Sequence, residues 1–473
     1  MAGSLDIVNM SDSPVHPASF GTTPTDLIGP ATRLALSNFA VSGRPMSMSV
    51  VRSLVVIKRA MANANSRFSD ITGIDEPTAT AIGLAADEVL RGDWDNQFGI
   101  DTFQTGSGTS TNMNVNEVLG ALAQRKLAGS TIHPNDHVNA SQSTNDVFPT
   151  AVRMAVLAEI RDVLMPGLDV LHDALVNRAD EFADVVKAGR THLMDASPIT
   201  LGQEFGGYAA QVAESRERIR DTCVRVAAVP LGGTATGNGL NAPDGVADIA
   251  IAEIARTTGL AVYATADRFA SQASPDALVE LSGQLRVTAT AMFKIANDIR
   301  LLASGPSTGL AEIRLPELQP GSSIMPGKVN PVLCEVVTQV AAQVIGNDAA
   351  IGFAGSQGTL EMNTYLPVIA DNLLASISLL GRATADFGAR CVLGIEADRD
   401  RCRAYAEASP AVATGLNVLI GYDAATNLVL RSRAEGRSIR DVLVDSGLVD
   451  AAEIDTVLDV DRLARGSLGS GLE

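Results

Sequence analysis

The strongest constraint on the fold is a series of long segments in which apolar residues recur at helical spacing. In the first segment, residues 151–184, they are interrupted only by Pro166-Gly167. Similar segments follow at about 200–228, 275–303, 331–351 and 366–389. Such stripes are typical of helices that bury one face against their neighbours. The pattern therefore predicts five long helices that pack as a bundle.

The apolar residues themselves favour helices over sheets. Hydrophobic residues make up 46% of the chain, but aromatic residues only 4%. A core of Ala, Leu, Val, Ile and Met suits long helices and is unusual for a β-sandwich. We therefore predict a mainly α protein. Its expected parts are a mostly helical N-terminal domain (1–140), a central long-helix bundle (141–394) and a small helical C-terminal domain (395–473).

One of these segments is apolar on more than one face. The run "VVTQVAAQVIG" at 336–346 places aliphatic residues all around the expected helix. Because a helix with two apolar faces is buried on both sides, the run predicts packing against other subunits.

Charge and cysteine content exclude several classes of protein. The chain has 36 basic and 54 acidic residues, a net charge of −18, and no basic cluster that could neutralise phosphates. Nucleic acid is therefore not an expected partner. The cysteines are distant in sequence and form no C-x-x-C pair, which argues against a disulfide framework, a thiolate metal site and an oxidising compartment. They are Cys223, Cys334, Cys391 and Cys402.

The start of the chain carries acidic residues and no arginine before Arg33. This composition differs from that of a transit or signal peptide. No uninterrupted apolar stretch is long enough to span a membrane. We therefore expect a cytoplasmic protein with no membrane partner.

The loop "GSSIMPGKVNP" (321–331) carries the densest chemistry. It offers two hydroxyls, a Pro-Gly turn, a lysine and an asparagine, and Pro331 stands where a helix is expected to begin. Backbone N–H groups and Lys328 could surround an anion or lower the pKa of a hydroxyl. By composition alone the same residues could form an ordinary flexible turn.

This string resembles the signature of the fumarase/aspartase superfamily, and its "PGKVNP" ending is similar to that of class II, iron-independent fumarases. Further similar blocks follow one another in the family's order from residue 105 to residue 399. They are "TGSGTSTNMNVNEV" (105–118), "HPNDHVNASQSTNDVFPT" (133–150), "GRTHLMDASPITLGQE" (189–204), "LGGTATGNGLN" (231–241), "KIANDIRLLASGP" (294–306) and "GIEADR" (394–399).

The resemblance implies the L-aspartase-like fold and a set of site residues. It implies reversible hydration of fumarate to (S)-malate, a step of the tricarboxylic acid cycle, without metal or other cofactor. The implied catalytic residues are His192, Ser322 and Glu335. The implied substrate-binding residues are Ser107, Gly108, Thr109, Ser143, Thr144, Asn145, Thr191, Ser323, Lys328, Val329 and Asn330.

Two positions bear on the choice between fumarase and aspartase. His192 lies in a polar link between two expected helices, where aspartases tend to carry glutamine, so it favours water as the leaving group. Thr144 stands at the middle of the family's Ser-Ser-Asn contact, as it also does in aspartases. Aspartate ammonia-lyase therefore remains the alternative, and a structural protein without activity is a second one.

The segment His133-Pro-Asn-Asp136-His137 has three interpretations. Two histidines four residues apart could bind a metal on a helix, but Pro134 breaks that face. The family resemblance implies instead that His133, Pro134, Asn135 and Asp136 form a second dicarboxylate site. A capped helix start at Asn135 or Asp136 is compatible with it.

A mechanism follows from the chemistry of malate. Removing the C3 proton creates an aci-carboxylate, which requires a base and fixed donors around the developing charge. We expect Ser322 to be the base, activated by backbone amides and Lys328. His192, through Glu335 or a water, would protonate the leaving hydroxide. Because the site residues come from distant segments, the family solution, a homotetramer whose sites each use three subunits, fits the sequence.

Overall fold

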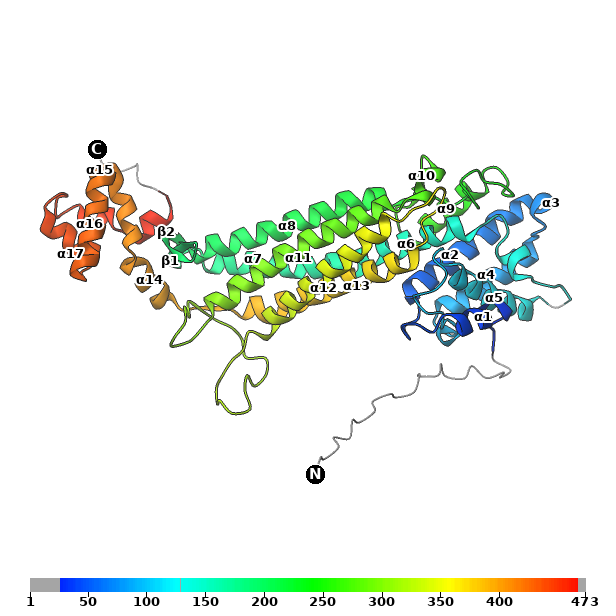
Figure 1. The fold of residues 1–473 in the computed structure, drawn as a ribbon, viewed down its shortest axis with the longest axis horizontal. Helices are drawn as coiled ribbons and strands as arrows, with labels where there is room; N and C mark the ends of the chain where they lie inside the picture. Colours follow the sequence, from blue (N-terminus) through cyan, green and yellow to red (C-terminus); the bar gives the residue numbers. More distant parts are fainter. Residues whose placement is uncertain (1–25, 128, 467–473) are drawn as a thin grey trace, which may run out of the picture. The chain divides into compact units, whose positions relative to one another are not determined.

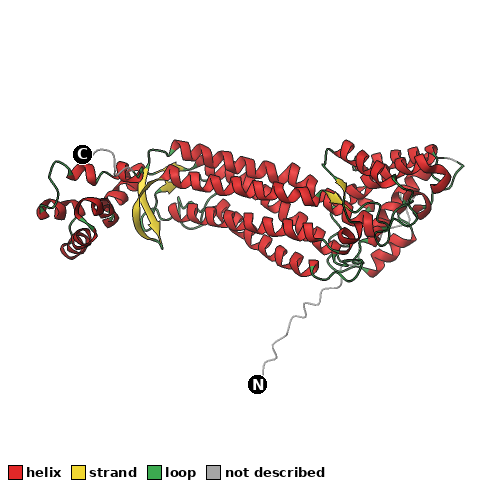
Figure 2. Cartoon of the chain, turned by 90° about the horizontal axis from the view of Figure 1, so that it is seen from above, coloured by secondary structure: helices red, strands yellow, loops and turns green. Residues whose placement is uncertain are grey.

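The computed structural model describes residues 26–127 and 129–466, and these are predominantly helical (Figure 2). They form two compact units. Unit 1 comprises residues up to 157 together with 226–278 and 351–372, and unit 2 comprises 158–225, 279–350 and 373 onward. The mainly α class predicted from the sequence is confirmed. The predicted lack of a targeting segment concerns residues 1–25, which lie outside the described residues, and the predicted boundaries at 140 and 394 stay predictions.

Unit 1 is a cluster of shorter helices. Helix α2 packs against α4 and α9, and α4 packs against α5. The helices of this unit are α1 (Pro30–Asn38), α2 (Met48–Asn65), α3 (Ser69–Thr72), α4 (Glu76–Leu90), α5 (Thr109–Lys126), α9 (Val246–Thr258) and α10 (Arg268–Ala273). Strands β3 (Ala228–Val229) and β4 (Tyr263–Ala264) pair in parallel. Helix α6 (Thr144–Glu159) begins in this unit.

Unit 2 contains most of the long helices, which run side by side (Figure 1). They are α7 (Met165–Glu181), α8 (Leu201–Val226), α11 (Asp276–Leu302), α12 (Val332–Gly355) and α13 (Leu366–Asp386). The predicted helical segments are therefore confirmed to within a few residues at most ends. Helix α12 begins one residue after Pro331, whose carbonyl accepts the N–H of Glu335 and so serves as the cap.

Polar side chains bridge successive helices of this bundle. The hydroxyl of Tyr208 on α8 donates to Asp298 on α11 at 3.1 Å. Ser282 on α11 donates to Asp348 on α12 at 2.7 Å. The neighbouring Asn347 donates to Ser376 on α13 at 3.0 Å. Because these bonds are largely shielded from water, they define the order of the helices as well as stabilising it.

Helices α7 and α13 approach each other very closely. A Cβ atom on Gly167 would lie 2.0 Å from the carbonyl oxygen of Gly381, and one on Gly381 would lie 2.7 Å from that of Val163. The apolar segment predicted at 151–184 contains part of α6, a π-helical turn (Ile160–Leu164) and α7, so the helical hydrogen-bond pattern changes just before Pro166-Gly167. Pro166 stands in the first turn of α7, directly after the π-helical turn, so the altered hydrogen-bond pattern lies beside the residue that lacks an N–H.

A β-hairpin and a set of small helices complete unit 2. Strands β1 (Val186–Thr191) and β2 (Met194–Thr200) form an antiparallel hairpin, and β5 (Ile313–Arg314) pairs with β6 (Glu396–Ala397). The helices after residue 394 share one apolar core, which includes Val186 of β1. They are α14 (Arg399–Ala408), α15 (Asn417–Ile420), α16 (Tyr422–Glu435), α17 (Ile439–Ser446), α18 (Ile454–Val457) and α19 (Val460–Ala464).

One described stretch, Leu366–Gly394, is long and apolar enough to cross a membrane, contrary to the sequence expectation that none reaches this length. Most of its apolar window is buried inside the chain, as in the core helix of a folded domain. The stretch is therefore weak evidence for a membrane span.

Candidate active site

The glycine-rich loop before α5 presents two neighbouring hydroxyls. The Oγ atom of Ser107 and the Oγ1 atom of Thr109 lie 2.7 Å apart at the N-terminus of the helix. Gly108 adopts a left-handed conformation with φ of +84°, and a Cβ atom there would lie 2.3 Å from the ring of Phe148. Only glycine fits at this position, so the loop is pressed against α6 with its hydroxyls at a positive helix end.

The predicted segment Ser143–Asn145 opens α6 beside this loop. Thr144 is buried, and its hydroxyl accepts a hydrogen bond of 3.0 Å from Asn112 of α5. The side-chain amide of Asn145 donates to the carbonyl of Ala235 at 2.9 Å. Three of the family-like blocks, 105–118, 133–150 and 231–241, are therefore brought together in unit 1.

A buried carboxylate fixes these connections. Asp146 accepts the backbone N–H of Ser143 on one oxygen, and those of Gly232 and Thr234 on the other, at 2.8–3.1 Å. Burial raises the pKa of Asp146 to about 6, although these hydrogen bonds and the charge of Lys58 oppose the shift. Asp146 was not among the predicted site residues.

Lys58 of α2 is a second buried group that the sequence analysis missed. Its ammonium donates to the Oδ1 atom of Asn139 at 2.6 Å, and the same oxygen accepts from Asn112 and Asn116 at 3.4 and 3.3 Å. Burial lowers the pKa of Lys58 to about 7, and the charge of Asp146 acts in the opposite direction. The position of Lys58 directly after the apolar residues LVVI of α2 is the sequence feature that could have indicated a buried lysine.

The segment after His133 forms a short π-helical turn, Pro134–Val138. The cap is His133 itself, whose Nδ1 accepts the N–H of Asp136 at 3.2 Å, so the expected cap at Asn135 or Asp136 is wrong. The ring of His137 in turn accepts the N–H of His133 at 2.9 Å. Within residues 26–127 and 129–466, no three His, Cys, Asp or Glu side chains gather as a metal site requires.

His192 lies at the tip of the β1–β2 hairpin, and this hairpin is the predicted link between two long helices, α7 and α8. His192 and Leu193 both have positive φ, 56° and 59°, and Thr191 pairs with Met194 across the turn. This is the geometry of a tight two-residue hairpin turn. The tip is exposed, and no described residue hydrogen-bonds the imidazole. The turn therefore presents the ring outward.

The serine loop (residues 321–330) closes on itself. The N–H of Gly321 donates to the carbonyl of Lys328 at 3.0 Å, and the side chain of Asn330 donates to the carbonyl of Gly321 at 2.7 Å. A Cβ atom on Gly321 would lie 2.0 Å from the Lys328 carbonyl oxygen, so glycine is required. These contacts fix the ends of the loop and leave its middle exposed.

Within this loop the Oγ atom of Ser322 accepts two backbone hydrogen bonds. The N–H groups of Ile324 and Met325 both donate to it at 3.2 Å. Two N–H dipoles directed at one oxygen favour negative charge on that oxygen. The hydroxyl of Ser322 is therefore in contact with two backbone amides, the kind of group expected to lower its pKa.

The remaining predicted residues lie on exposed parts of unit 2. Ser323, Lys328 and Val329 are exposed in the serine loop, and Glu335 is exposed in the first turn of α12. Among the described residues no ion pair joins Glu335 to His192. The predicted set thus divides between the units. Ser107–Thr109, His133–Asp136 and Ser143–Asn145 lie in unit 1, whereas Thr191, His192, Ser322–Asn330 and Glu335 lie in unit 2.

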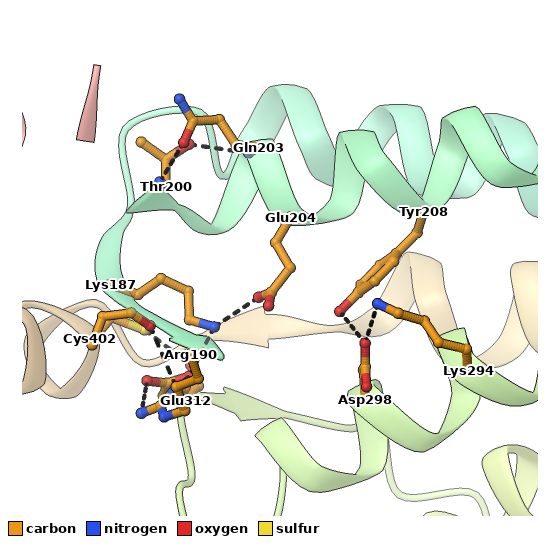
Figure 3. Close-up of polar contacts among 11 residues, drawn as sticks. Lys187, Arg190, Thr200, Gln203, Glu204, Tyr208, Lys294, Asp298, Glu312 and Cys402 are labelled. Atoms are coloured by element: carbon orange, nitrogen blue, oxygen red, sulfur yellow. Dashed lines mark hydrogen bonds and ion pairs between the residues drawn. The ribbon is translucent and has the colours of Figure 1, made fainter. Parts of the chain in front are cut away.

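A charged cluster along strand β1 of the hairpin was not among the predicted site residues. Lys187 of β1 contacts both Glu204 of α8 and Glu312, and Arg190 forms a two-pronged contact with Glu312 (Figure 3). Both Lys187 and Glu312 are buried. No sequence motif indicates this cluster, because its residues come from three separate segments of the chain.

Comparison with known proteins identifies the family of the chain. Residues 26–346 match a family model described as a lyase, and residues 412–465 match one described as the fumarase C C-terminus. The chain is 49% identical to a class II fumarate hydratase of Corynebacterium glutamicum, covering 92% of each chain. It is 45% identical to a mitochondrial fumarate hydratase of Rattus norvegicus, covering 91% of this chain and 86% of the relative.

A solved structure shares the fold over nearly the whole length. The class II fumarase of Schistosoma mansoni superimposes with a TM-score of 0.91 at 36% identity, covering 94% of this chain and 97% of that one. The family model covers more than half of the chain, and the relatives match it almost end to end. The chain therefore belongs to the class II fumarate hydratases of the fumarase/aspartase superfamily.

Proposed function

We propose that the chain catalyses the reversible hydration of fumarate to (S)-malate. Membership of the family supports this reaction. The relatives from a bacterium and from an animal are named fumarate hydratases, and each matches more than 90% of this chain. The observation that carries the proposal within the molecule is the hydroxyl of Ser322, which accepts two backbone N–H groups in a closed loop.

Ser322 is the proposed base. As an alkoxide it removes the C3 proton of malate, and the electron pair left on C3 is delocalised into the adjacent carboxylate as an aci-carboxylate. The N–H groups of Ile324 and Met325 stabilise the alkoxide without any rearrangement of the loop. Lys328 belongs to the same short loop, and its positive charge would favour the alkoxide and the bound carboxylate.

His192 is the proposed acid on the opposite face of the substrate. It donates a proton to the hydroxyl that leaves C2, directly or through Glu335 or a water. Its position at the tip of a tight hairpin supports this role, because such a turn extends a single ring beyond the surface of unit 2. No metal takes part in either proposed proton transfer.

The binding groups surround the two carboxylates. The proposed donors include hydroxyls and the backbone N–H groups at the start of a helix. Such groups bind an anion by direct contact, whereas the charges of distant residues are screened by salt. The proposed substrate contacts are Ser107, Gly108, Thr109, Ser143, Thr144, Asn145, Thr191, Ser323, Lys328, Val329 and Asn330. We also propose His133–Asp136 as a second dicarboxylate site, supported by its exposed imidazole and asparagine.

The proposed assembly is a homotetramer whose active sites each combine three subunits. Apolar side chains on α12 support it, because 42% of Val336 and 44% of Ile345 is exposed. A second subunit would bury this surface, since apolar area removed from water stabilises association. We place the protein in the cytoplasm, where its four free thiols stay reduced, and in the tricarboxylic acid cycle.

A single optical assay tests the reaction. Fumarate absorbs near 240 nm, so malate and aspartate can be supplied in turn to the purified chain and the appearance of absorbance followed. Turnover of malate alone supports the proposal. Turnover of aspartate alone identifies an ammonia-lyase, and no turnover of either identifies a structural protein.

A further inference from the structure

Four charged side chains of alternating sign hold strand β1 of the hairpin, from Lys187 near its start to Arg190 beside the turn. Lys187 donates to Glu204 at 2.7 Å and lies 3.2 Å from Glu312. Arg190 reaches both oxygens of Glu312, at 2.7 and 3.0 Å (Figure 3). Two positive and two negative charges are thereby combined, with Glu312 as the anion that contacts both cations.

Glu312 is also tied to the segments around it through its backbone. Its N–H donates to the carbonyl of Leu302 at the end of α11, and its carbonyl accepts from the N–H of Asp398 at 2.9 Å. The thiol of Cys402 on α14 donates to the same carbonyl at 3.5 Å. Glu312 is therefore fixed in both backbone and side chain.

Burial makes these contacts strong. The Glu312 side chain has no exposed surface, Lys187 is 2% exposed and Arg190 is 16% exposed. Although burial acts to lower it, the hydrogen bonds and charge of Glu312 raise the pKa of Arg190. Removing one partner of a buried pair leaves the other charge uncompensated, so the cluster tolerates little displacement.

The cluster lies next to the residues that the proposed mechanism uses. Arg190 immediately precedes Thr191 and His192. The hairpin turn consists of only two residues, His192 and Leu193, because Thr191 pairs with Met194. Glu312 belongs to the same connection between α11 and α12 as Ser322. The carboxylate thus joins the strand that carries the proposed acid to the segment that carries the proposed base.

We propose that Glu312 is a positioning residue for catalysis, which holds the hairpin through Lys187 and Arg190 so that His192 is presented at a fixed place. This inference rests on the proposed function. Glu312 does not touch the substrate in this proposal. Its effect is transmitted along β1, from a two-pronged contact with Arg190 to the imidazole two residues later.

The test compares Glu312→Gln and Glu312→Asp with the parent chain in the malate assay. Glutamine removes the charge, and aspartate keeps the charge but is one methylene too short to reach both donors of Arg190. Because a misplacement of ~1 Å can cost about 100-fold in rate, we expect kcat to fall about 10- to 100-fold in both variants. We expect KM to stay within about threefold, since the carboxylate-binding groups are unchanged.

Glu396→Gln is the matched control. Glu396 on β6 pairs with Arg314 on the adjoining strand β5, but both side chains are mostly exposed, so its loss should leave kcat and KM unchanged. Circular dichroism and oligomeric state are measured for all variants. If Glu312→Gln fails to fold, Glu312→Asp alone decides by the same criteria.

Two results would overturn the inference. One is a folded Glu312 variant that keeps the parent kcat, and the other is a rise in KM without a fall in kcat. A parent chain that does not hydrate fumarate overturns the proposed function, and the inference with it. These failures differ in whether the parent chain is active.

Discussion

The ammonium nitrogen of Lys58 lies 2.6 Å from the amide oxygen of Asn139, and the lysine side chain is completely buried. Burial lowers its pKa to about 7, with the charge of Asp146 opposing the shift. An unfolded lysine titrates near about 10.4. Between these values the unfolded state binds more protons than the folded state, so this group makes the folded state more stable as pH rises from about 7 to about 10.

Lys58→Met removes this pH-dependent contribution. We expect the melting temperature of the parent chain, minus that of the variant, to increase as pH is raised across that window. Thermal unfolding followed by circular dichroism at several pH values measures it. Lys126→Met, at an exposed lysine paired with Glu88, is the control and should show no such trend. A difference that stays constant from pH 7 to pH 10 would contradict the assignment.

Asp146→Asn tests the anchor behind the Ser143–Asn145 segment. Both carboxylate oxygens of Asp146 accept hydrogen bonds from backbone N–H groups. Asparagine has only one acceptor oxygen, so its NH₂ group would face N–H donors and leave them without an acceptor. Leaving buried donors unpaired costs ~1–3 kcal/mol. We expect a lower unfolding free energy and a KM for malate raised more than kcat is reduced. Asp173→Asn, at a side chain 81% exposed, should change neither quantity.

Ser322→Ala removes the proposed base. General base catalysis contributes about 100- to 10,000-fold, so we expect kcat to fall by at least about 100-fold with a modest change in KM. Ser307→Ala lies in the same connection between α11 and α12, is exposed, and should retain parent activity. Steady-state kinetics with malate measure both variants. Normal turnover by Ser322→Ala would refute the base assignment.

Gly167→Ala tests the close contact between α7 and α13. The new methyl group would meet the carbonyl oxygen of Gly381 at 2.0 Å. Overpacking of this kind costs ~1–3 kcal/mol, so the melting temperature should fall. Gly83→Ala in α4 is the control, because a Cβ there meets nothing within 4 Å and alanine favours a helix. A Gly167 variant as stable as the parent chain would mean that the helices can separate without cost.

The long helices were predictable because the spacing of apolar residues that indicates a helix repeats along each segment. Apolar spacing in residues 200–228 and 275–303 identified α8 and α11 with ends displaced by only one or two residues. The β1–β2 hairpin was not predictable in the same way. Its strands, "VKAGRT" and "MDASPIT", mix charged and small residues, and their register shifts between Ala188 and Gly189.

The candidate site was recognised in sequence where it consists of short contiguous motifs. Ser322 and its loop are an example, since the amides that contact the hydroxyl follow it within three residues. Lys58 and Glu312 were missed for a physical reason. A charged residue in an apolar run is usually expected at the surface, and its burial depends on partners that the sequence places far away.

The close approach of α7 and α13 has a consequence for turnover. With glycine on both sides of the contact, no side chain lies between the two backbones whose rotation would let one helix slide past the other. We therefore expect α7 and α13 to move together as one rigid unit. We expect movement during turnover to occur in the connections between helices, such as residues 303–331, and changes in the composition of these connections to alter the rate.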